Sequence, residues 1–248
     1  MNIKALTEDV TTIGHIVARN YRTADVFKKY GIDFCCKGGR LLEEVCKEKN
    51  LNLATIENEL IEKMAVVTPV IEDVYQSMQL DELTTHIENV HHKYVRDNIS
   101  VLMGYLHKIN SVHGPKHPEL NEIYQLFEDC GHELLQHMIK EETILFPAIR
   151  KIVSATKNGT KNIKPFFFGS LSNPIGMMEN EHTKEGERFF KIAELSSGFT
   201  APEDGCATYL VAFQKLKEFQ NDLFQHIHLE NNILFPGALK MEEALSRD

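Results

Sequence analysis

Two segments of this 248-residue chain repeat one pattern of charged and apolar residues. Glu141 follows His137 by four positions, Glu230 follows His226 by four positions, and both pairs precede the same Ile-Leu-Phe-Pro sequence. The two copies are 89 residues apart. Because residues i and i+4 lie on one face of an α-helix, each pair is expected to point in one direction. The repeat therefore predicts two equivalent helices that present His and Glu to a common centre.

A lone histidine precedes each copy at a matching distance. His92 lies 45 residues before His137, and His182 lies 44 residues before His226. His92 and His182 are 90 residues apart, close to the spacing of the two pairs. The repeated unit is therefore a pair of helices, and each unit supplies one His followed by a His and a Glu.

Four long amphipathic helices are expected to carry these residues. Apolar side chains recur every three or four positions over about 79–109, 119–150, 174–196 and 205–235. Loops rich in Gly, Pro, Asn and Ser separate these stretches, and no strand-like alternation lies between them. The sequence therefore predicts an all-α fold with an antiparallel four-helix bundle over residues 76–248.

The repeated His and Glu residues lie on the apolar stripes, so they are expected to be buried. Each buried polar group without a partner costs about 1 to 3 kcal/mol, and a charged group costs more. A metal removes this cost, because neutral imidazoles and carboxylates become its ligands. Four His and two Glu exceed a tetrahedral zinc site, and mixed nitrogen and oxygen donors suit iron or manganese. We expect two metal ions bridged by Glu141 and Glu230; a duplication retained for packing alone is the alternative.

The other eight histidines do not share this spacing. His91 is adjacent to His92 and is expected to point about 100° away from it around the helix. The remaining seven are interpreted as surface or capping residues: His15, His86, His107, His113, His117, His132 and His228.

Two glutamates lie next to expected ligands. Glu133 is one turn before His137, and Glu181 immediately precedes His182. Either carboxylate is a candidate to orient a ligand or to guide cations and protons to the centre. A solvated position at the helix boundary is the alternative for both.

Residues 1–65 are expected to form a separate small helical domain that contains a cysteine pair. Gly31 and the glycines after Lys37 interrupt the helical pattern on either side of Cys35 and Cys36, which predicts a turn or a helix start there. Pro69 breaks any helix between Met64 and Val70 and marks the domain boundary.

Adjacent thiols can transfer electrons, hold iron transiently or contact the thiols of a partner. The nearby Lys37 could favour a thiolate at Cys35 or Cys36. An inert pair in a turn is the alternative. The three other cysteines are interpreted as packing residues: Cys46, Cys130 and Cys206.

The charge balance excludes one class of partner. With 27 Lys and Arg against 36 Asp and Glu, the net charge of −9 does not suit a nucleic-acid binder. No apolar run approaches the roughly 18 residues of a membrane span, and the N-terminus lacks a signal-peptide pattern. Five cysteines are too few for a disulfide framework. We expect a soluble cytoplasmic protein without a membrane or nucleic-acid partner.

The chain is similar to the di-iron proteins for repair of iron centres, which join a short di-cysteine domain to a hemerythrin-like bundle. The resemblance covers nearly the whole chain. It rests on the Cys35 and Cys36 motif that begins at Gly31, on the two His and Glu repeats with their Leu-Phe-Pro sequences, and on residues 179–182. In that family Gly follows the cysteine pair directly, whereas Lys37 intervenes here.

The resemblance implies two non-haem iron ions, oxo- and carboxylate-bridged. Their ligands are the six residues that spacing selects: His92, His137, Glu141, His182, His226 and Glu230. It further implies repair of iron-sulfur clusters damaged by nitric oxide or peroxide, with iron donated to damaged iron-sulfur proteins or a cluster-assembly scaffold. A homodimer is compatible with the resemblance.

Two other functions remain open at this point. Two neighbouring metals can bind and couple two nitric oxide molecules, which would make the protein a di-iron nitric oxide reductase. A hemerythrin-like protein that binds or senses oxygen or nitric oxide is the third hypothesis. The attached cysteine domain disfavours a pure carrier. The residue pattern alone leaves manganese as an alternative to iron.

Overall fold

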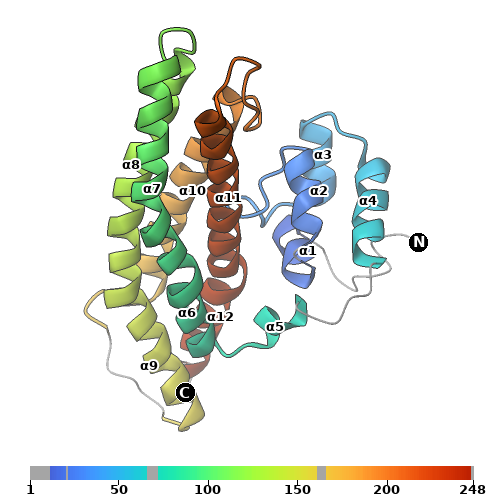
Figure 1. Ribbon diagram of the computed structural model, residues 1–248. Coiled ribbons are helices and arrows are strands. Elements are labelled where there is room, and N and C mark those ends of the chain that lie inside the picture. The colour runs from blue at the N-terminus through green and yellow to red at the C-terminus, as the bar shows by residue number, and fades with distance from the viewer. Residues whose placement is uncertain (1–11, 21, 66–71, 161–165, 247–248) are drawn as a thin grey trace.

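Four long helical rods form an antiparallel bundle, and several short helices pack against one side of it (Figure 1). This computed structural model describes residues 12–20, 22–65, 72–160 and 166–246. The described residues contain no named β-strand, so the predicted all-α class is confirmed.

Three of the four rods contain a short π-helical segment between two α-helices. The first rod comprises α6 (Leu80–Ile87), η2 (Glu88–His92) and α7 (Lys93–His113). The second comprises α8 (Glu119–Lys140), η3 (Glu141–Leu145) and α9 (Phe146–Lys157). The third is α10 (Ser172–Leu195). The fourth comprises α11 (Ala207–Leu229), η4 (Glu230–Leu234) and α12 (Phe235–Ser246).

Three of the predicted rod ends fall short of the observed ends. The first rod continues through 110–113, which the sequence assigned to a loop: α7 ends at His113, and the Gly114 amide still donates to the carbonyl of Asn110. The second and fourth rods continue beyond their prolines to Lys157 and Ser246. Proline is tolerated there because it stands in the first turn of a new α-helix.

Two apolar clusters fill the bundle, one on each side of a polar layer. Along the first rod, Leu83 and Ile87 belong to one cluster, whereas Val95 and Leu102 belong to the other. The second and fourth rods change cluster in the same way near Glu141 and Glu230. The repeated His and Glu residues therefore occupy a layer between two water-excluding cores.

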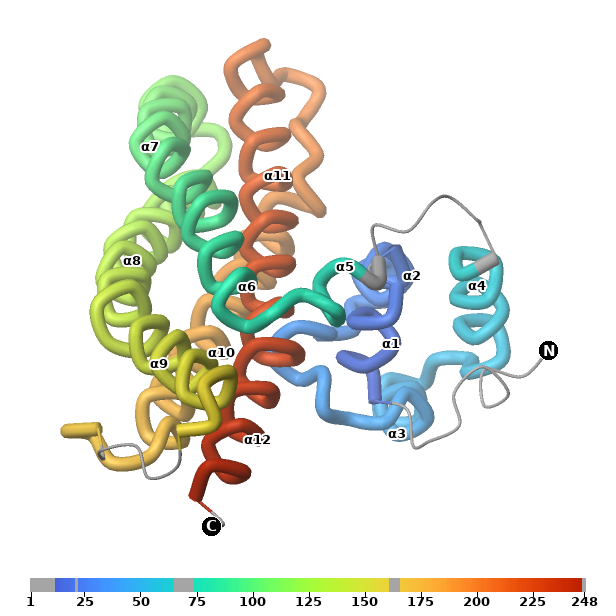
Figure 2. Tube along the Cα trace, turned by 90° about the horizontal axis from the view of Figure 1, so that it is seen from below, coloured from blue at the N-terminus to red at the C-terminus, as the bar shows by residue number. Residues whose placement is uncertain are grey.

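Four short helices form the N-terminal part: α1 (Ile13–Arg19), α2 (Thr23–Lys29), α3 (Leu42–Glu48) and α4 (Leu53–Ala65). They lie to one side of the bundle, and α5 (Glu72–Ser77) leads from them towards α6 (Figure 2). The Phe34 ring packs edge-on against Phe224 of α11, and both belong to one continuous core. Pro69 and the predicted domain boundary lie outside the described residues.

The burial of several residues differs from the sequence interpretation. His228 is 3% exposed, so its assignment to the surface is wrong. His91, which was expected only to point away from His92, is also buried, with 2% exposed. The π-helical segment presents His91 to α11, and Phe34 packs against His228. Cys46 and Cys130 are buried as predicted, whereas Cys206 is exposed at the start of α11.

Among the described helices, none combines the length and the apolar character needed to cross a membrane.

Candidate metal centre

Six buried side chains converge in the polar layer between the two apolar clusters. Each is at most 3% exposed, and each ring nitrogen Nε2 lies close to a carboxylate oxygen. The side chains are those of His92, His137, Glu141, His182, His226 and Glu230. The structure thus brings together the six residues that sequence spacing selects.

Glu141 reaches two histidines at once. Its Oε1 lies 3.3 Å from Nε2 of His137, and its Oε2 lies 3.3 Å from Nε2 of His92. One carboxylate is therefore shared between a histidine on its own rod and a histidine on the neighbouring rod.

Glu230 does the same in the other half. Its Oε1 lies 3.1 Å from Nε2 of His226, and its Oε2 lies 3.2 Å from Nε2 of His182. The six residues form two four-residue groups that share both glutamates, one with His92 and His226, the other with His137 and His182.

The donors fit a pair of metal ions. Both oxygens of Glu141, Oε2 of Glu230 and Nε2 of His92 are buried without a hydrogen-bond partner. Each such orphaned group costs about 1 to 3 kcal/mol, and more when it is charged. Two cations between the shared carboxylates would satisfy these atoms, and nitrogen with oxygen donors is a set that iron and manganese accept.

Three of the four histidines are oriented from behind by a polar side chain. Nδ1 of His92 lies 2.7 Å from Oε1 of Glu142, and Nδ1 of His137 lies 2.8 Å from Oε2 of Glu181. Nδ1 of His182 lies 2.8 Å from Oδ1 of Asn231. Such contacts fix the ring orientation and direct the Nε2 lone pair to the centre.

The roles of Glu142 and Asn231 were not predicted, although the repeat contains a signal for them. Each immediately follows a shared glutamate, and the two are 89 residues apart. Each orients the lone histidine of its own half. The Glu142 carboxylate also pairs with Arg96 at 2.5 Å, whereas the side-chain amide of Asn231 donates to the carbonyl of Cys35 in the N-terminal part of the chain.

His226 is the exception among the four histidines. Its Nδ1 is buried and has no hydrogen-bond partner, and its ring stacks on His91 with centroids 5.6 Å apart. His91 precedes His92 just as Glu181 precedes His182, so the two occupy equivalent places in the repeat. Nδ1 of His91 is held 3.0 Å from Oδ1 of Asp222. This support was not predicted, because the helical period places His91 about 100° away from His92 and so gave it no role at the centre.

The neighbouring carboxylates determine the charge of His137 in the metal-free protein. Burial lowers the pKa of His137, but Glu141 and Glu181 outweigh it and raise the pKa to about 10. The hydrogen bond to His137, aided by Lys140, lowers the pKa of Glu181 to about 2. A binding metal must therefore displace a proton from His137, while Glu181 stays ionised behind the ring.

The two candidate outer glutamates lie in different surroundings. Glu181 contacts His137, whereas Oε1 of Glu133 accepts a hydrogen bond from Nη2 of Arg188 at 3.0 Å. Both border a cavity of about 140 Å³ that is also lined by His137 and His182. The group with His137 and His182, called here the second histidine group, therefore borders a cavity. None of the described pockets is lined by His92 or His226.

Residues of the six-residue cluster begin or end all three π-helical segments. η3 and η4 begin at Glu141 and Glu230, and η2 ends at His92. Pro147 and Pro236 stand two residues after the ends of η3 and η4. Proline has no N–H to donate, and its ring crowds the carbonyl four residues earlier, so the preceding helical turn widens. The prolines were a sequence signal for these segments; η2 has no such proline.

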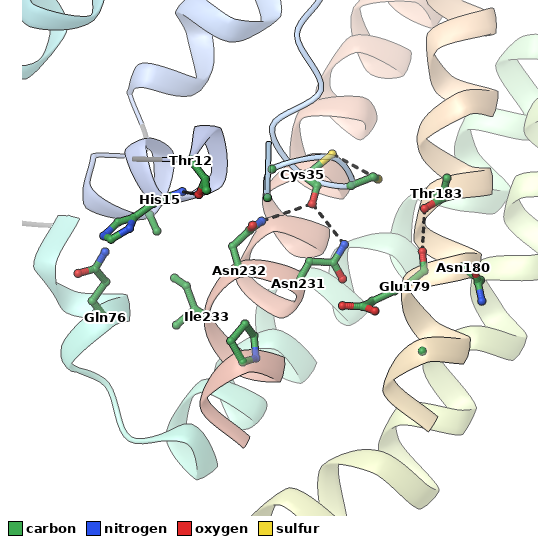
Figure 3. Close-up of a pocket in the computed structure, with 16 residues that line it drawn as sticks. Thr12, His15, Cys35, Gln76, Glu179, Asn180, Thr183, Asn231, Asn232 and Ile233 are labelled. Atoms are coloured by element: carbon green, nitrogen blue, oxygen red, sulfur yellow. Dashed lines mark hydrogen bonds between the residues drawn. The ribbon is translucent and has the colours of Figure 1, made fainter. Parts of the chain in front are cut away.

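The cysteine pair lies in a turn, as predicted, and the turn docks beside the second histidine group. The Cys36 thiol donates to the carbonyl of His182 at 3.2 Å. Asn231 and Asn232 both donate to the carbonyl of Cys35 at 3.3 Å (Figure 3). Burial raises the pKa of the Cys35 thiol well above its usual value, so a thiolate favoured by Lys37 is wrong for Cys35.

Two family models match the chain. The hemerythrin HHE cation binding domain matches residues 83–238, which contain all six converging side chains. The ScdA_N domain, described as a domain of unknown function, matches residues 9–64, which contain the cysteine pair.

Curated relatives align over most of their own length. A probable iron-sulfur cluster repair protein of Haemophilus influenzae is 35% identical over 86% of this chain and 90% of its own. The iron-sulfur cluster repair protein YtfE of Escherichia coli O81 is 31% identical over 93% of this chain and 97% of its own. The iron-sulfur cluster repair protein ScdA of Staphylococcus haemolyticus is 29% identical over 90% of this chain and 95% of its own.

Proposed function

The chain belongs to the family of iron-sulfur cluster repair proteins with an ScdA_N and a hemerythrin-like domain, and we propose that it repairs clusters damaged by nitrosative or oxidative stress. In this proposal it binds two non-haem irons, bridged by carboxylates and an oxo group, and donates iron. The observation that supports it best is the pair of four-donor groups sharing Glu141 and Glu230.

The residues around the centre have separate tasks in this proposal. Bound iron would supply a Lewis-acidic, exchangeable metal. Glu142, Glu181 and Asn231 orient three histidines, and the apolar clusters keep water away from the ligands. The cavity beside His137 and His182 offers a route by which iron enters past Glu133.

The partners in this proposal are damaged iron-sulfur proteins or a cluster-assembly scaffold. Cys35 and Cys36 suit the transfer step, because the Cys36 thiol contacts the backbone carbonyl of His182, a residue of the six-residue centre. A cytoplasmic location and a homodimer, both expected from the sequence, remain predictions.

Recovery of a damaged cluster enzyme tests the function. A hydratase whose cluster has been damaged by nitric oxide should regain activity faster with the wild-type protein than with the double variant His137→Ala, Glu141→Ala. The exposed His132→Ala variant is the matched control, since it removes a histidine next to the same cavity. Equal recovery with the wild type and the double variant would reject the proposal.

The role of Glu133 can be tested separately. If its carboxylate guides iron through the cavity, Glu133→Leu should slow iron loading while circular dichroism stays unchanged. Glu128→Leu, on the same helix α8 but away from this cavity, should load normally.

Nitric oxide reduction is a second candidate, favoured by the cavity that two histidines of one group border. Two neighbouring metals can hold two nitric oxide molecules there, and coupling them to nitrous oxide and water takes up two electrons and two protons. Multiple turnovers of nitrous oxide under anaerobic conditions with a chemical reductant would support this activity. Less than one nitrous oxide per di-iron centre would favour repair alone, with nitric oxide or oxygen as a bound ligand.

A further inference from the structure

We propose that the turn bearing Asp33, Cys35 and Cys36 is a third metal site, which takes one thiophilic divalent cation such as Fe²⁺ or Zn²⁺. The inference rests on the proposed repair function and deepens it, because a separate thiolate site next to the bundle gives the transferred cation a place outside the di-metal centre.

The three donors have the spacing of ligands to one ion. Two sulfurs bound to one tetrahedral metal at about 2.3 Å lie about 3.8 Å apart, and the Sγ atoms of Cys35 and Cys36 lie 3.6 Å apart. A carboxylate oxygen and a sulfur on the same metal lie about 3.6 Å apart, and Oδ1 of Asp33 lies 3.3 Å from Sγ of Cys35. One ligand atom from each residue lies within 4.8 Å of the others.

The turn holds these donors in place through its own backbone. Oδ1 of Asp33 accepts hydrogen bonds from the amides of Cys35 at 3.2 Å and Cys36 at 2.9 Å. The amide of Gly14 donates to the carbonyl of Gly38 at 2.7 Å, which anchors the far side of the turn. A Cβ added at Gly38 would lie 2.4 Å from the carbonyl oxygen of Phe34, so the turn requires glycine at this position. A binding cation therefore finds its three donors already close together and displaces the protons of the two thiols.

A large cavity gives solute access to the turn. Its volume is about 960 Å³, and both cysteines line it together with Glu179 and Thr183 of α10 (Figure 3). Three protein donors leave coordination positions open on this side. An ion held by an incomplete set of ligands exchanges with an incoming ligand, which suits a transfer site.

The turn is also joined to the di-metal centre. Asn231 donates to the carbonyl of Cys35 and accepts from Nδ1 of His182, so one amide connects the two sites. The thiol of Cys36 contacts the carbonyl of the same histidine. The proposed site is therefore adjacent to the second histidine group, on the side where the N-terminal part packs.

Anaerobic titration of the full-length, metal-free protein with Co²⁺ tests the site. Cobalt bound to thiolates has an intense near-ultraviolet charge-transfer band that histidine and carboxylate ligands do not produce. The wild type should bind three Co²⁺ per chain and show this band. Cys35→Ser with Cys36→Ser should bind two Co²⁺ without the band, whereas Cys206→Ser should behave as the wild type.

A second variant separates ligation from folding. Asp33→Asn retains an oxygen that can accept the two backbone hydrogen bonds but removes the charge, so it should keep the turn and weaken the third Co²⁺ at least tenfold. Two Co²⁺ per wild-type chain without a thiolate band would overturn the site, as would an Asp33→Asn affinity equal to that of the wild type.

Failure of this inference is distinguishable from failure of the proposed function. Without a third site, the wild type can still restore a damaged cluster through the six-residue centre. If the repair function is wrong, no recovery occurs even though the thiolate band forms.

Discussion

Asn231 accepts a hydrogen bond from Nδ1 of His182 at 2.8 Å, and the acceptor must be its side-chain oxygen. The proton of this imidazole is therefore on Nδ1, and Nε2 presents a lone pair to the centre. The amide nitrogen of Asn231 donates to the carbonyl of Cys35. A single side chain thus fixes the tautomer of one expected ligand and binds the cysteine turn.

Removing this amide should weaken metal binding. Asn231→Ala frees the ring of His182, and loss of such an orienting contact typically lowers metal affinity by about 10- to 100-fold. Competition with a chromogenic chelator measures the change. Asn232→Ala is the matched control, because Asn232 also donates to the Cys35 carbonyl but contacts His228 rather than a ligand. Equal losses in both variants would assign the effect to the cysteine turn.

The shared carboxylates predict different metal stoichiometries for different variants. In a chain that also carries Cys35→Ser and Cys36→Ser, Glu141→Gln and Glu230→Gln each remove a charge that both four-residue groups use, so each should lower the content from two metals towards none. In the same background, His92→Gln and His137→Gln each affect one group and should retain about one metal per chain. Elemental analysis after loading and desalting checks this. Retention of one metal by both glutamate variants would show that neither carboxylate bridges.

The sequence was sufficient to predict the fold class and to select the six converging residues, because both follow from helical periodicity and from an internal repeat. The apolar stripes of the predicted helices are buried, for example at Phe127, Phe189 and Phe219. The matching spacing of His92 and His182 from the two His and Glu pairs was enough to select them, whatever the structure of the connecting loops.

Contacts between elements that are distant in sequence could not be predicted in the same way. His91 becomes buried because α11 packs against it, and His228 because Phe34 of the N-terminal part covers it. Both depend on the relative placement of elements distant in sequence, which a helical period does not encode. The wider π-helical turns were missed because periodicity treats each rod as one α-helix, although proline follows η3 and η4.

His91 should position His226 through its ring. His91→Ala removes the stacked imidazole and should lower metal affinity by about tenfold, with a change in the optical spectrum of the iron-loaded protein. His91→Phe keeps an aromatic ring at this position but cannot bond to Asp222. If His91→Phe restores the metal affinity, stacking on His226 is responsible; if it does not, the hydrogen bond with Asp222 is responsible. His86→Ala, which contacts His91 but no expected ligand, should leave metal affinity unchanged.

His228 should make the stability of the metal-free protein depend on pH. Burial lowers its pKa from 6.5 to about 4, so between these values the unfolded chain binds more protons, and stability falls as pH falls. Between pH 7.5 and pH 5 this one residue should remove about 2 kcal/mol from the free energy of unfolding. His228→Phe keeps the contact with Phe34 and should lose that share of the pH dependence. Urea unfolding of both metal-free proteins at the two pH values measures the difference, with exposed His15→Phe as the control. Identical pH dependence in the wild type and His228→Phe would mean that His228 is not held neutral in the folded state.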